Sequence, residues 1–373
     1  MEFVVVGLGA AGSAALNALA RPGASCVGID RYAPPHIWGS SHGETRLLRT
    51  AYAEGAQYVP MARRAIKLWR ELEARTGTDL FRQTGVVYAG PPTSPFLSAS
   101  LAAAREHGVR VDDLTDRERE RLHPALDIPA DWLCCVEREG GYLLTEPAIA
   151  ALLRDARAHG AELRFDETCR AIEPDASGVR IVTDRGELRA EKCIVASGAW
   201  TAELLPALAA YLHVERKTLH WFADPQRLYT PDTFRPFLVD DESGHQVYGF
   251  PDCGTGVKIA EHTAPSPVYV RAADVARDIT SEETERIGAF VRRYCPNVGA
   301  LSRSVTCLYP MSKDGHFILD VHAEMDRVFV AAGLSGHGFK FAPVIGDAVA
   351  NLARGMDQAI DVGFFSIRRF ETA

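Results

Sequence analysis

The sequence lacks any long apolar run. None of its 373 residues belongs to a segment approaching the roughly 18 consecutive apolar residues that a membrane helix requires. An apolar β run begins by Phe3, which leaves no room for the charged and apolar regions of a cleavable signal peptide. We therefore expect a cytoplasmic protein that has no membrane partner.

The eight cysteines lack the spacing of a redox or metal site. Only Cys134 and Cys135 are neighbours, no CxxC motif occurs, and no histidine stands at metal-ligand spacing from a cysteine. The pattern indicates reduced thiols, with no disulfide framework and no bound metal.

Positive charge is in deficit. Lys and Arg number 41 against 49 Asp and Glu, for a formal net charge of -8. This balance argues against non-specific nucleic-acid binding and against a polybasic membrane anchor. Internal repeats and low-complexity segments are also missing, and the 47% of hydrophobic residues is ordinary for a globular protein. At this length two domains are the first expectation.

The N-terminal stretch MEFVVVGLGAAGSAALNALARPGASCVGIDRY carries a dinucleotide-binding pattern. A buried strand over residues 2–6 runs into Gly7-Leu8-Gly9-Ala10-Ala11-Gly12, a helix follows to about Ala20, and a second strand over 26–29 ends at Asp30. A GxGxxG between strand and helix, with an acidic residue closing the next strand, is the context that the fingerprint requires. By itself, the motif does not distinguish NAD from FAD.

Each residue of the motif has a physical role. Gly7 permits the tight turn, Gly9 lets the backbone approach a pyrophosphate, and Gly12 allows the helix to pack closely on the strand. The helix N-terminus stabilises phosphate charge, and Asp30 can accept hydrogen bonds from a ribose diol.

The remaining pattern predicts an interleaved two-domain protein. Helices are expected over 59–75, 146–159, 281–294 (after the cap-like TSEE) and 342–353, and strands over 84–89, 163–165, 178–183 with 187–190, from 193, 317–320 and 327–331. Residues 213–275 are β-rich. We predict an α/β and α+β fold: a Rossmann-type FAD-binding domain (1–84, 138–212 and 317–373) and a β-rich substrate domain formed from two insertions (85–137 and 213–316).

The choice of FAD comes from a family resemblance. The stretch DRYAPPHIWGSSHGETRLLRTAYAEG (30–55) resembles the sarcosine oxidase and N-methyl-L-tryptophan oxidase group of the D-amino-acid-oxidase-like flavoproteins. Further blocks agree in order along the whole chain: SGAW (197–200), YGFP (248–251), KIAEH (258–262), TCLYP (306–310) and AAGLSGHGFKFAPVIGD (331–347). The SHGETR and GLSGHGFKFAP blocks are much more specific than the glycine motif.

The resemblance implies a covalent cofactor. A cysteine alone in an apolar strand is ordinarily an inert core residue. At the position of Cys307, however, the enzymes of this group carry FAD through a thioether to the 8α carbon of the flavin. The residues to which the resemblance and the motif assign FAD binding are Gly7, Gly9, Ala10, Ala11, Gly12, Asp30, Arg31, Ser40, His42, Thr45, Arg46, Cys169, Gly198, Trp200, Cys307, Gly333, Gly336, His337, Gly338 and Lys340.

Substrate and oxygen residues are also implied. Arg49 and Lys340 match a carboxylate clamp, although Arg49 alone would read as a surface residue or an ion pair with Glu54. The pocket lining matches Tyr248, His262 and Tyr309, with His262 in a binding and polarising role.

The expected catalytic group comprises Lys258, Arg46, His42 and His262. Lys258 matches the oxygen-activating lysine, although strand alternation alone would also permit it to face solvent. Arg46 and His42 match residues close to the flavin on its oxygen side. Thr45 matches a flavin neighbour, and a capping role for its hydroxyl is equally plausible from sequence.

The reaction so implied is oxidative demethylation of sarcosine or another N-methyl amino acid by O2, giving H2O2, formaldehyde and the primary amino acid, in a protein expected to be a monomer. Oxidation of N-methyltryptophan or of a cyclic amino acid such as pipecolate stays open, as do a dehydrogenase with another electron acceptor and a non-catalytic flavin-binding protein. Residues 213–247 depart from the group, and Trp221 and Phe222 there would enlarge or close the pocket.

Overall fold

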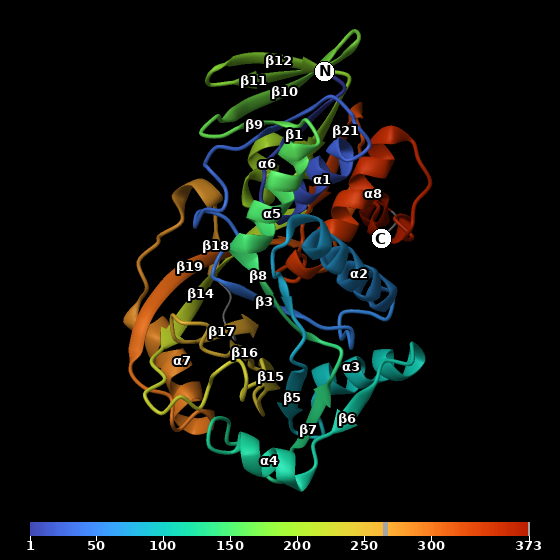
Figure 1. Ribbon diagram of the computed structural model, residues 1–373. Helices are drawn as coiled ribbons and strands as arrows, with labels where there is room; N and C mark the ends of the chain where they lie inside the picture. Colours follow the sequence, from blue (N-terminus) through green and yellow to red (C-terminus); the bar gives the residue numbers. More distant parts are fainter. Residues whose placement is uncertain (264–267, 372–373) are drawn as a thin grey trace.

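A six-stranded sheet forms the upper half of the molecule (Figure 1). The computed structural model describes residues 1–263 and 268–371 of the protein. The strand order is β20-β21-β13-β1-β2-β9, parallel throughout except for the β20–β21 pair. The strands are β1 (Phe3–Val6), β2 (Cys26–Ile29), β9 (Glu162–Arg164), β13 (Lys192–Val195), β20 (Ile318–His322) and β21 (Met325–Ala332). All four residues of β1 are buried, as a continuous apolar run predicts for a parallel strand covered on both faces.

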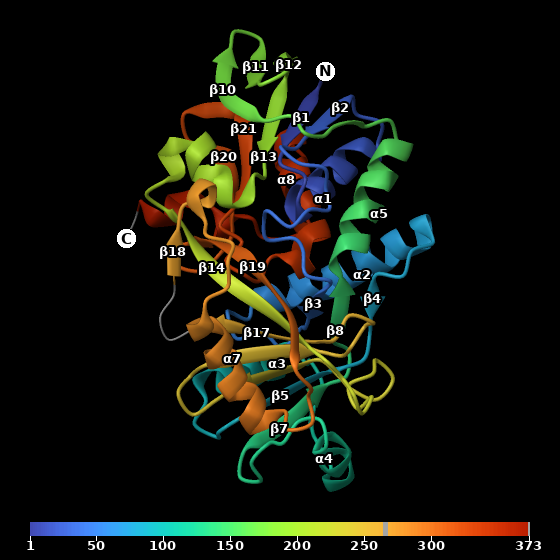
Figure 2. The ribbon, with the colours of Figure 1, turned by 90° about the vertical axis from the view of Figure 1, so that its left-hand side faces the viewer.

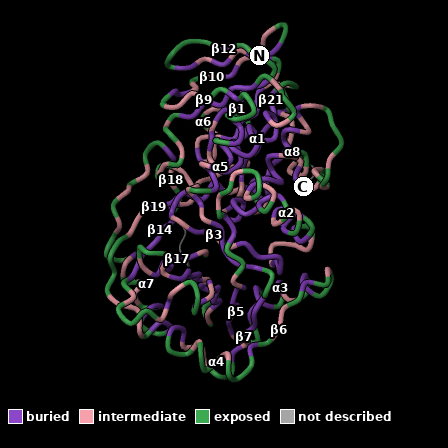
Figure 3. Tube along the Cα trace, in the orientation of Figure 1, coloured by how far each residue is buried: buried purple, intermediate pink, exposed green. Residues whose placement is uncertain are grey.

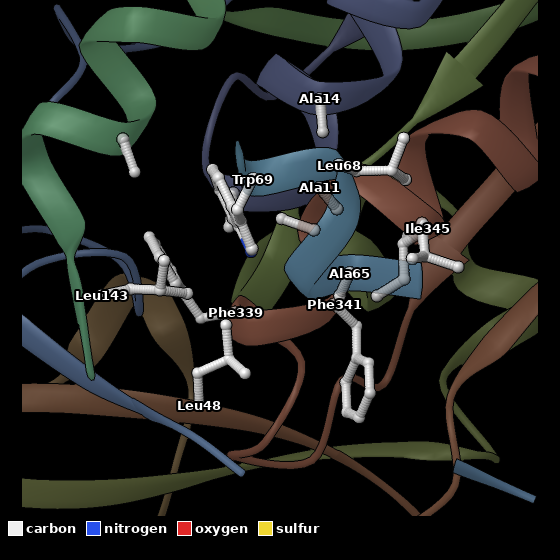
Figure 4. Packing of buried hydrophobic residues seen from close by; sticks show 14 of the residues in the cluster. Ala11, Ala14, Leu48, Ala65, Leu68, Trp69, Leu143, Phe339, Phe341 and Ile345 are labelled. Carbon is white, nitrogen blue, oxygen red and sulfur yellow. The ribbon is translucent and has the colours of Figure 1, made fainter. Parts of the chain in front are cut away.

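Four helices build the core beside this sheet: α1 (Ala10–Ala20), α2 (Tyr58–Thr76), α5 (Thr145–Ala158) and α8 (Ala342–Arg354). Every residue of α1 is buried, because small side chains let α5 and α8 approach it closely. At Gly346 of α8 an added Cβ would lie 2.5 Å from the Ala14 backbone. Figure 4 shows this packing, with Trp69 of α2 reaching toward Phe339. The Trp69 Nε1 group donates to the Lys340 carbonyl at 2.8 Å, which anchors the GHGFKF segment.

A second large sheet forms the lower half, in the order β18-β14-β17-β16-β15-β5-β7-β6, with β19 also paired to β14 (Figure 2). Its longest ladder joins β14 and β19, and it places Lys217 opposite Cys307. The strands are β5 (Val86–Gly90), β6 (Val111–Asp113), β7 (Leu133–Glu137), β14 (Leu212–Phe222), β15 (Phe237–Asp240), β16 (Gln246–Phe250), β17 (Val257–Thr263), β18 (Val268–Val270) and β19 (Leu301–Ser312). The helix α7 (Ser281–Tyr294) contacts β17.

Two small sheets complete the fold. One sheet, β3-β8-β4, contains β3 (Thr45–Leu48), β4 (Phe81–Arg82) and β8 (Gly141–Leu144), and β3 lies between the two large sheets. The other contains β10 (Cys169–Asp175), β11 (Gly178–Thr183) and β12 (Gly186–Ala190) at one end of the molecule. Burial follows the two large sheets and the helices beside them (Figure 3). Among the described residues, no helix is both long enough and apolar enough to cross a bilayer.

The predicted elements are confirmed where the local pattern is strong. All four predicted helices form, the 178–190 hairpin forms, and Thr280 with Glu283 makes a full capping box before α7. The predicted strand 84–89 is wrong at its start, because β5 begins only at Val86. Neither α3 (Pro95–Glu106) nor α4 (Asp116–Leu122) was predicted, nor was the length of β19. Of these, α4 has no buried residue and therefore no apolar stripe to read.

The strands of the second large sheet come from residues 86–137 and 212–312, and those of the first from 3–29, 162–195 and 318–332. This distribution follows the two predicted insertions, although the domain boundaries themselves stay a prediction. Residues 264–267 and 372–373, which fall within the predicted ranges 213–275 and 317–373, lie outside the described residues.

Candidate active site

A cavity of about 320 Å³ starts at the carboxyl end of β1 and reaches the strand β19. Fourteen of the twenty residues predicted to bind FAD line it. They are Gly7, Gly9, Ala10, Ala11, Asp30, Arg31, Ser40, Arg46, Cys169, Gly198, Trp200, Gly333, Gly336 and Gly338. Ligands of open parallel sheets bind at this edge, where strand order reverses on either side of the first strand.

The glycine turn is shaped for a phosphate. Gly7 has a φ of +88°, and a Cβ at Gly12 would lie 1.7 Å from the Gly7 carbonyl oxygen, so both positions exclude a side chain. Gly12 does not line the cavity, and its role is the predicted helix packing. Ser41 accepts the Ala10 N–H at 3.1 Å, whereas the N–H groups of Ala11 and Gly12 have no partner among the described residues. These free donors at the start of α1 suit an anion.

Asp30 lines the cavity in a fixed orientation. Its Oδ2 accepts the Leu8 N–H at 2.6 Å, and its Oδ1 accepts the Tyr32 N–H at 2.9 Å. Because each carboxylate oxygen has two lone pairs, both oxygens can still accept a hydroxyl donor from a ligand.

Trp200 supplies a second sign of a missing partner. Its Nε1 is buried without a hydrogen-bond partner, and its side chain lines the cavity. A buried indole N–H that contacts no protein acceptor indicates that a ligand accepts the bond. The Arg31 guanidinium carbon lies 5.7 Å from the indole centroid.

Cys307 lies behind the cavity wall, fully buried. Its Sγ accepts a hydrogen bond from Arg46 Nη2 at 3.7 Å and lies 3.8 Å from the Ser40 carbonyl oxygen, and both of these residues line the cavity. The next two residues of β19, Leu308 and Tyr309, also form part of the wall. The thiol therefore lies beside the part of the cavity wall that Ser40, Arg46 and β19 form.

A second cavity of about 50 Å³ adjoins the first, and Arg46, Tyr309, Gly336 and Phe339 line both. Every residue predicted to bind substrate lies on its wall: Arg49, Lys340, Tyr248, Tyr309 and His262. His337, predicted as a cofactor residue, lines this cavity rather than the large one, as does Lys340. Trp221 and Phe222 line neither cavity, so they neither enlarge nor close it.

The predicted carboxylate clamp carries an internal anion. Arg49 is buried, and its Nη2 donates to both carboxylate oxygens of Glu54, at 2.7 and 2.9 Å. Arg49 holds the pKa of Glu54 well below its usual range, and burial opposes that shift. Arg49 therefore forms the ion pair with Glu54 that was one alternative, and it also lies on the cavity wall, as the predicted clamp requires. It is not a surface residue.

Lys340 is the more available cation of the clamp. Its Nζ donates to Tyr52 Oη and to the His337 carbonyl, both at 3.0 Å, and these are two of its three N–H groups. Burial, together with Arg49, lowers the pKa of Lys340 to about 7. Burial likewise lowers the pKa of His262 to about 3 and that of His337 to about 4, so both imidazoles are neutral at physiological pH.

Lys258 is buried, at 1% exposure, which rules out the solvent-facing alternative. Its ammonium donates to the Gly43 carbonyl at 2.6 Å, to the Thr45 carbonyl at 2.7 Å and to Thr45 Oγ1 at 3.2 Å. Thr45 is thus a ligand of Lys258 in β3, not a helix cap. Burial and the nearby Arg46 lower the pKa of Lys258 well below its ordinary value, whereas the three oxygen acceptors favour its charged form. Lys258 lines neither cavity.

His42 also lies behind the cavity wall, close to the positive charges of Arg46 and Lys258. Burial, followed by the charge of Arg46, lowers the pKa of His42 to about 3, and its Nε2 is buried without a partner. Near it, Glu146 accepts the backbone N–H groups of Gly43 and Glu44 at 2.8 and 3.0 Å.

Sequence reasoning missed several groups of this site. Glu54, Tyr52 and Glu146 each contact a predicted residue, but they belong to no motif that could single them out. Phe339 stands inside the GHGFKF block and lines both cavities, so its place in that block was a usable signal.

Comparison with known proteins agrees with this geometry. A family model described as FAD dependent oxidoreductase (DAO) matches residues 2–352. The chain is 35% identical over 369 residues to an N-methyl-L-tryptophan oxidase of Yersinia pestis (strain Pestoides F), covering 99% of each sequence.

Solved structures share the fold. NikD, described as an unusual amino acid oxidase essential for nikkomycin biosynthesis, superposes with a TM-score of 0.86 at 25% identity over 98% of this chain and 96% of its own. Glycine oxidase from Geobacillus kaustophilus superposes with a TM-score of 0.80 at 23% identity, over 99% and 98%. The free N–H groups at the start of α1 and the unpartnered Trp200 donor fit FAD in the large cavity. The chain belongs to the DAO family of FAD-dependent oxidoreductases, with a Rossmann-type FAD-binding region and a β-rich substrate-binding region.

Proposed function

We propose that this protein is an FAD-dependent amine oxidase that removes the N-methyl group of a small N-methyl amino acid, with sarcosine as the simplest substrate. The net reaction consumes the methylated amine, O2 and water, and yields the primary amino acid, formaldehyde and H2O2. The observation that carries the proposal is the small cavity joined to the cofactor cavity, which combines a buried cationic clamp with aromatic walls.

The size of the substrate cavity favours a small molecule. A cavity needs about 10–15 Å³ to hold one water, so about 50 Å³ accommodates only a few heavy atoms beside the flavin. Leu238, Tyr248 and Phe250 form its apolar side. Sarcosine fits this description better than an amino acid with an indole side chain.

The clamp orients the substrate by its carboxylate. The third N–H of Lys340 is available to donate to this anion, and Arg49 adds a second positive charge. Glu54 already holds Arg49 through two hydrogen bonds and therefore competes with the substrate carboxylate. The net affinity for substrate therefore depends on how much more strongly Arg49 binds the substrate carboxylate than the carboxylate of Glu54.

The same charges prepare the amine. An amine donates electrons only when its nitrogen lone pair is free, and the nearby cations Arg49 and Lys340 lower the pKa of a bound ammonium group. His262 and His337 add no positive charge, because both are neutral. Bound here, FAD would supply the two-electron oxidation of the amine with O2 as the final acceptor, and hydrolysis of the oxidised amine would release formaldehyde.

We further propose that Cys307 carries FAD through a thioether to the 8α carbon. The support is the position of its sulfur beside Arg46 and Ser40 of the large cavity's wall. The C–S bond would replace the thiol S–H and one C–H of the methyl group, so that two protons and two electrons would pass to O2, which the proposed reaction already uses. Arg46 would hold the sulfur in this position through its hydrogen bond.

We assign oxygen activation to Lys258 with Arg46. An added Cβ at Gly43 would lie 3.6 Å from Arg46 Nη1 and 3.7 Å from Lys258 Nζ, so the two cations stand close together. Fixed positive charge favours the first electron transfer to O2, which creates an anion. Gly43 and Thr45 hold Lys258 in place so that no reorganisation is needed when that anion forms.

N-methyltryptophan is the second candidate substrate, because a relative of that name is 35% identical over the whole chain. Its indole would need the wall formed by Leu238, Tyr248 and Phe250 to move outward. A preference for this substrate would therefore show that the cavity opens on binding.

An anaerobic titration of the purified protein tests the proposal. Sarcosine, N-methyl-L-tryptophan, pipecolate and proline are added in turn, and bleaching of the oxidised flavin band identifies the substrate. Admitting air should then restore the band within seconds with formation of H2O2. Slow restoration would indicate a dehydrogenase, and no bleaching by any of the amines would contradict the proposed function.

A further inference from the structure

The pocket histidine His262 occupies an irregular position in its strand. On β16 the consecutive residues Gln246 and Val247 pair with Thr263 and Glu261 of β17, so His262 is the extra residue of a β-bulge. A bulged residue has no ladder partner and is a common way to direct a side chain into a site. What holds the neighbouring residue therefore determines where His262 points.

That neighbour, Glu261, belongs to a buried charge cluster and does not line the substrate cavity. Its Oε1 accepts from His245 Nε2 at 2.5 Å and from Arg286 Nε at 2.7 Å, and its Oε2 accepts from Arg286 Nη2 at 2.8 Å. Glu261 is 5% exposed and His245 8%. A buried carboxylate with three charge-assisted bonds has little rotational freedom.

The cluster joins three elements of the fold. His245 ends the turn between β15 and β16, Glu261 belongs to β17, and Arg286 comes from α7, which packs on β17 (Figures 1 and 2). The turn is held by Asp241, whose Oδ1 accepts the N–H groups of Ser243 and His245 at 2.8 and 3.1 Å. The cluster therefore ties both strands that flank the bulge to one helix.

We propose that His245 is a positioning residue for substrate binding: through Glu261 it fixes the bulge that directs His262 into the substrate cavity. This inference rests on the proposed function of that cavity. His245 touches neither substrate nor cofactor and acts through the backbone of β17. The KIAEH block identified His262, but nothing in the sequence connects His245 or Arg286 to it.

The charges around His245 predict a pH dependence. Asp241 faces it from the turn at 3.7 Å and Glu261 from β17, while Arg286 of α7 and His220 of β14 interact electrostatically with Glu261. The hydrogen bonds of Asp241 and Glu261 raise the pKa of His245 to about 9 against the opposing effect of burial. The charge cluster of His245, Asp241, Glu261 and Arg286 is thus complete below the ordinary histidine range, and it is lost as the pH rises through about 9 and His245 loses its proton.

Acetate binding to the holoenzyme tests the proposal without turnover, read from the flavin absorbance change. At pH 8, His245→Gln and Glu261→Gln should each weaken acetate roughly fivefold, as expected when a coupled partner is removed. Arg286→Lys, which keeps the positive charge beside Glu261, should retain most of the wild-type affinity for acetate. The matched control Glu285→Gln, an exposed position on the same helix, should leave the affinity unchanged.

The wild-type protein provides a test that does not depend on a variant folding. Its acetate affinity should fall in two steps, one near pH 7 as Lys340 loses its proton and one near pH 9 as His245 does. In His245→Gln only the second step should vanish, and KM for the substrate should rise more than kcat falls.

A failure of all amines to reduce the flavin would contradict the function and leave the acetate result standing. Unchanged acetate affinity in both variants, or a single step in the wild type, would overturn the role of His245.

Discussion

At the scale of single residues, the tether is the most direct prediction. Cys307→Ser removes the sulfur that the proposed thioether requires while keeping the side chain small. The acid-precipitated wild-type protein should stay yellow, whereas the variant should release its flavin into the supernatant, and the colour of both fractions measures this. Cys193→Ser, at a buried cysteine outside both cavity walls, is the matched control and should keep the colour in the pellet.

Lys258→Met removes a buried charge and keeps the length of the side chain. Reoxidation of the flavin by O2 should slow by about 100-fold or more, the range found when a single preorganised charge partner is removed, while reduction by substrate changes little. Stopped-flow absorbance separates the two half-reactions. Equal slowing of both would remove the assigned role.

The pH dependence of reoxidation belongs to the same residue. The lowered pKa of Lys258 means that its charge is present at low pH and is lost as the pH rises, well below the range in which free lysine titrates. The reoxidation rate of the wild type should therefore fall with rising pH, and Lys258→Met should flatten this profile.

Glu54→Gln tests the competition inside the clamp. Removing the anion frees Arg49, so acetate should bind several-fold more tightly in a titration of the flavin spectrum. Removing the carboxylate also leaves the buried Arg49 without its counter-charge, so the ligand-free variant should lose unfolding free energy, by less than the roughly 3–5 kcal/mol of a fully buried pair because Glu54 is partly exposed. Weaker acetate binding would show that Glu54 supports the clamp rather than competing with the substrate.

At the scale of elements, we expect the contact between the turn after β1 and α1 to affect FAD binding. In Gly12→Ala the new Cβ would lie 1.7 Å from the Gly7 carbonyl oxygen, so the helix must move away from the turn. We expect a loss of about 1–3 kcal/mol from overpacking, together with loss of bound FAD. Unfolding curves and the flavin-to-protein ratio measure both effects. Gly288→Ala in α7, where the nearest atom is the flexible end of Arg292 at 3.2 Å, should keep its FAD.

Elements also show how far the sequence could be read. The βαβ unit, α7 with its capping box and α8 follow from local periodicity and capping, and each forms where it was predicted. In contrast, α3, α4 and the full length of β19 were missed. The length of β19 depends on its ladder with β14, which starts about ninety residues earlier in the chain.

At the scale of the whole molecule, one chain supplies both cavities. Their walls join β1, the 30–46 segment, β16, β17, β19 and the 331–340 segment without a second copy. We therefore expect the activity per chain to stay constant when the enzyme is diluted 100-fold below its assay concentration, a range over which weak dimers dissociate. A fall in specific activity on dilution, with sedimentation showing dissociation, would contradict an independent monomer.

By itself the sequence determined the nucleotide turn, the main helices and the residues of the SHGETR, KIAEH and GHGFKF blocks, because these depend on neighbours along the chain. Only the tertiary structure decided what those residues contact. Lys258 is held by Gly43 and Thr45, and Cys307 lies beside Arg46, across more than two hundred residues of sequence. The bulge at His262 and the ion pair of Glu54 with the buried Arg49 likewise arise from strand register and burial. Register and burial are properties of the packed sheets, and no local pattern in one chain specifies them.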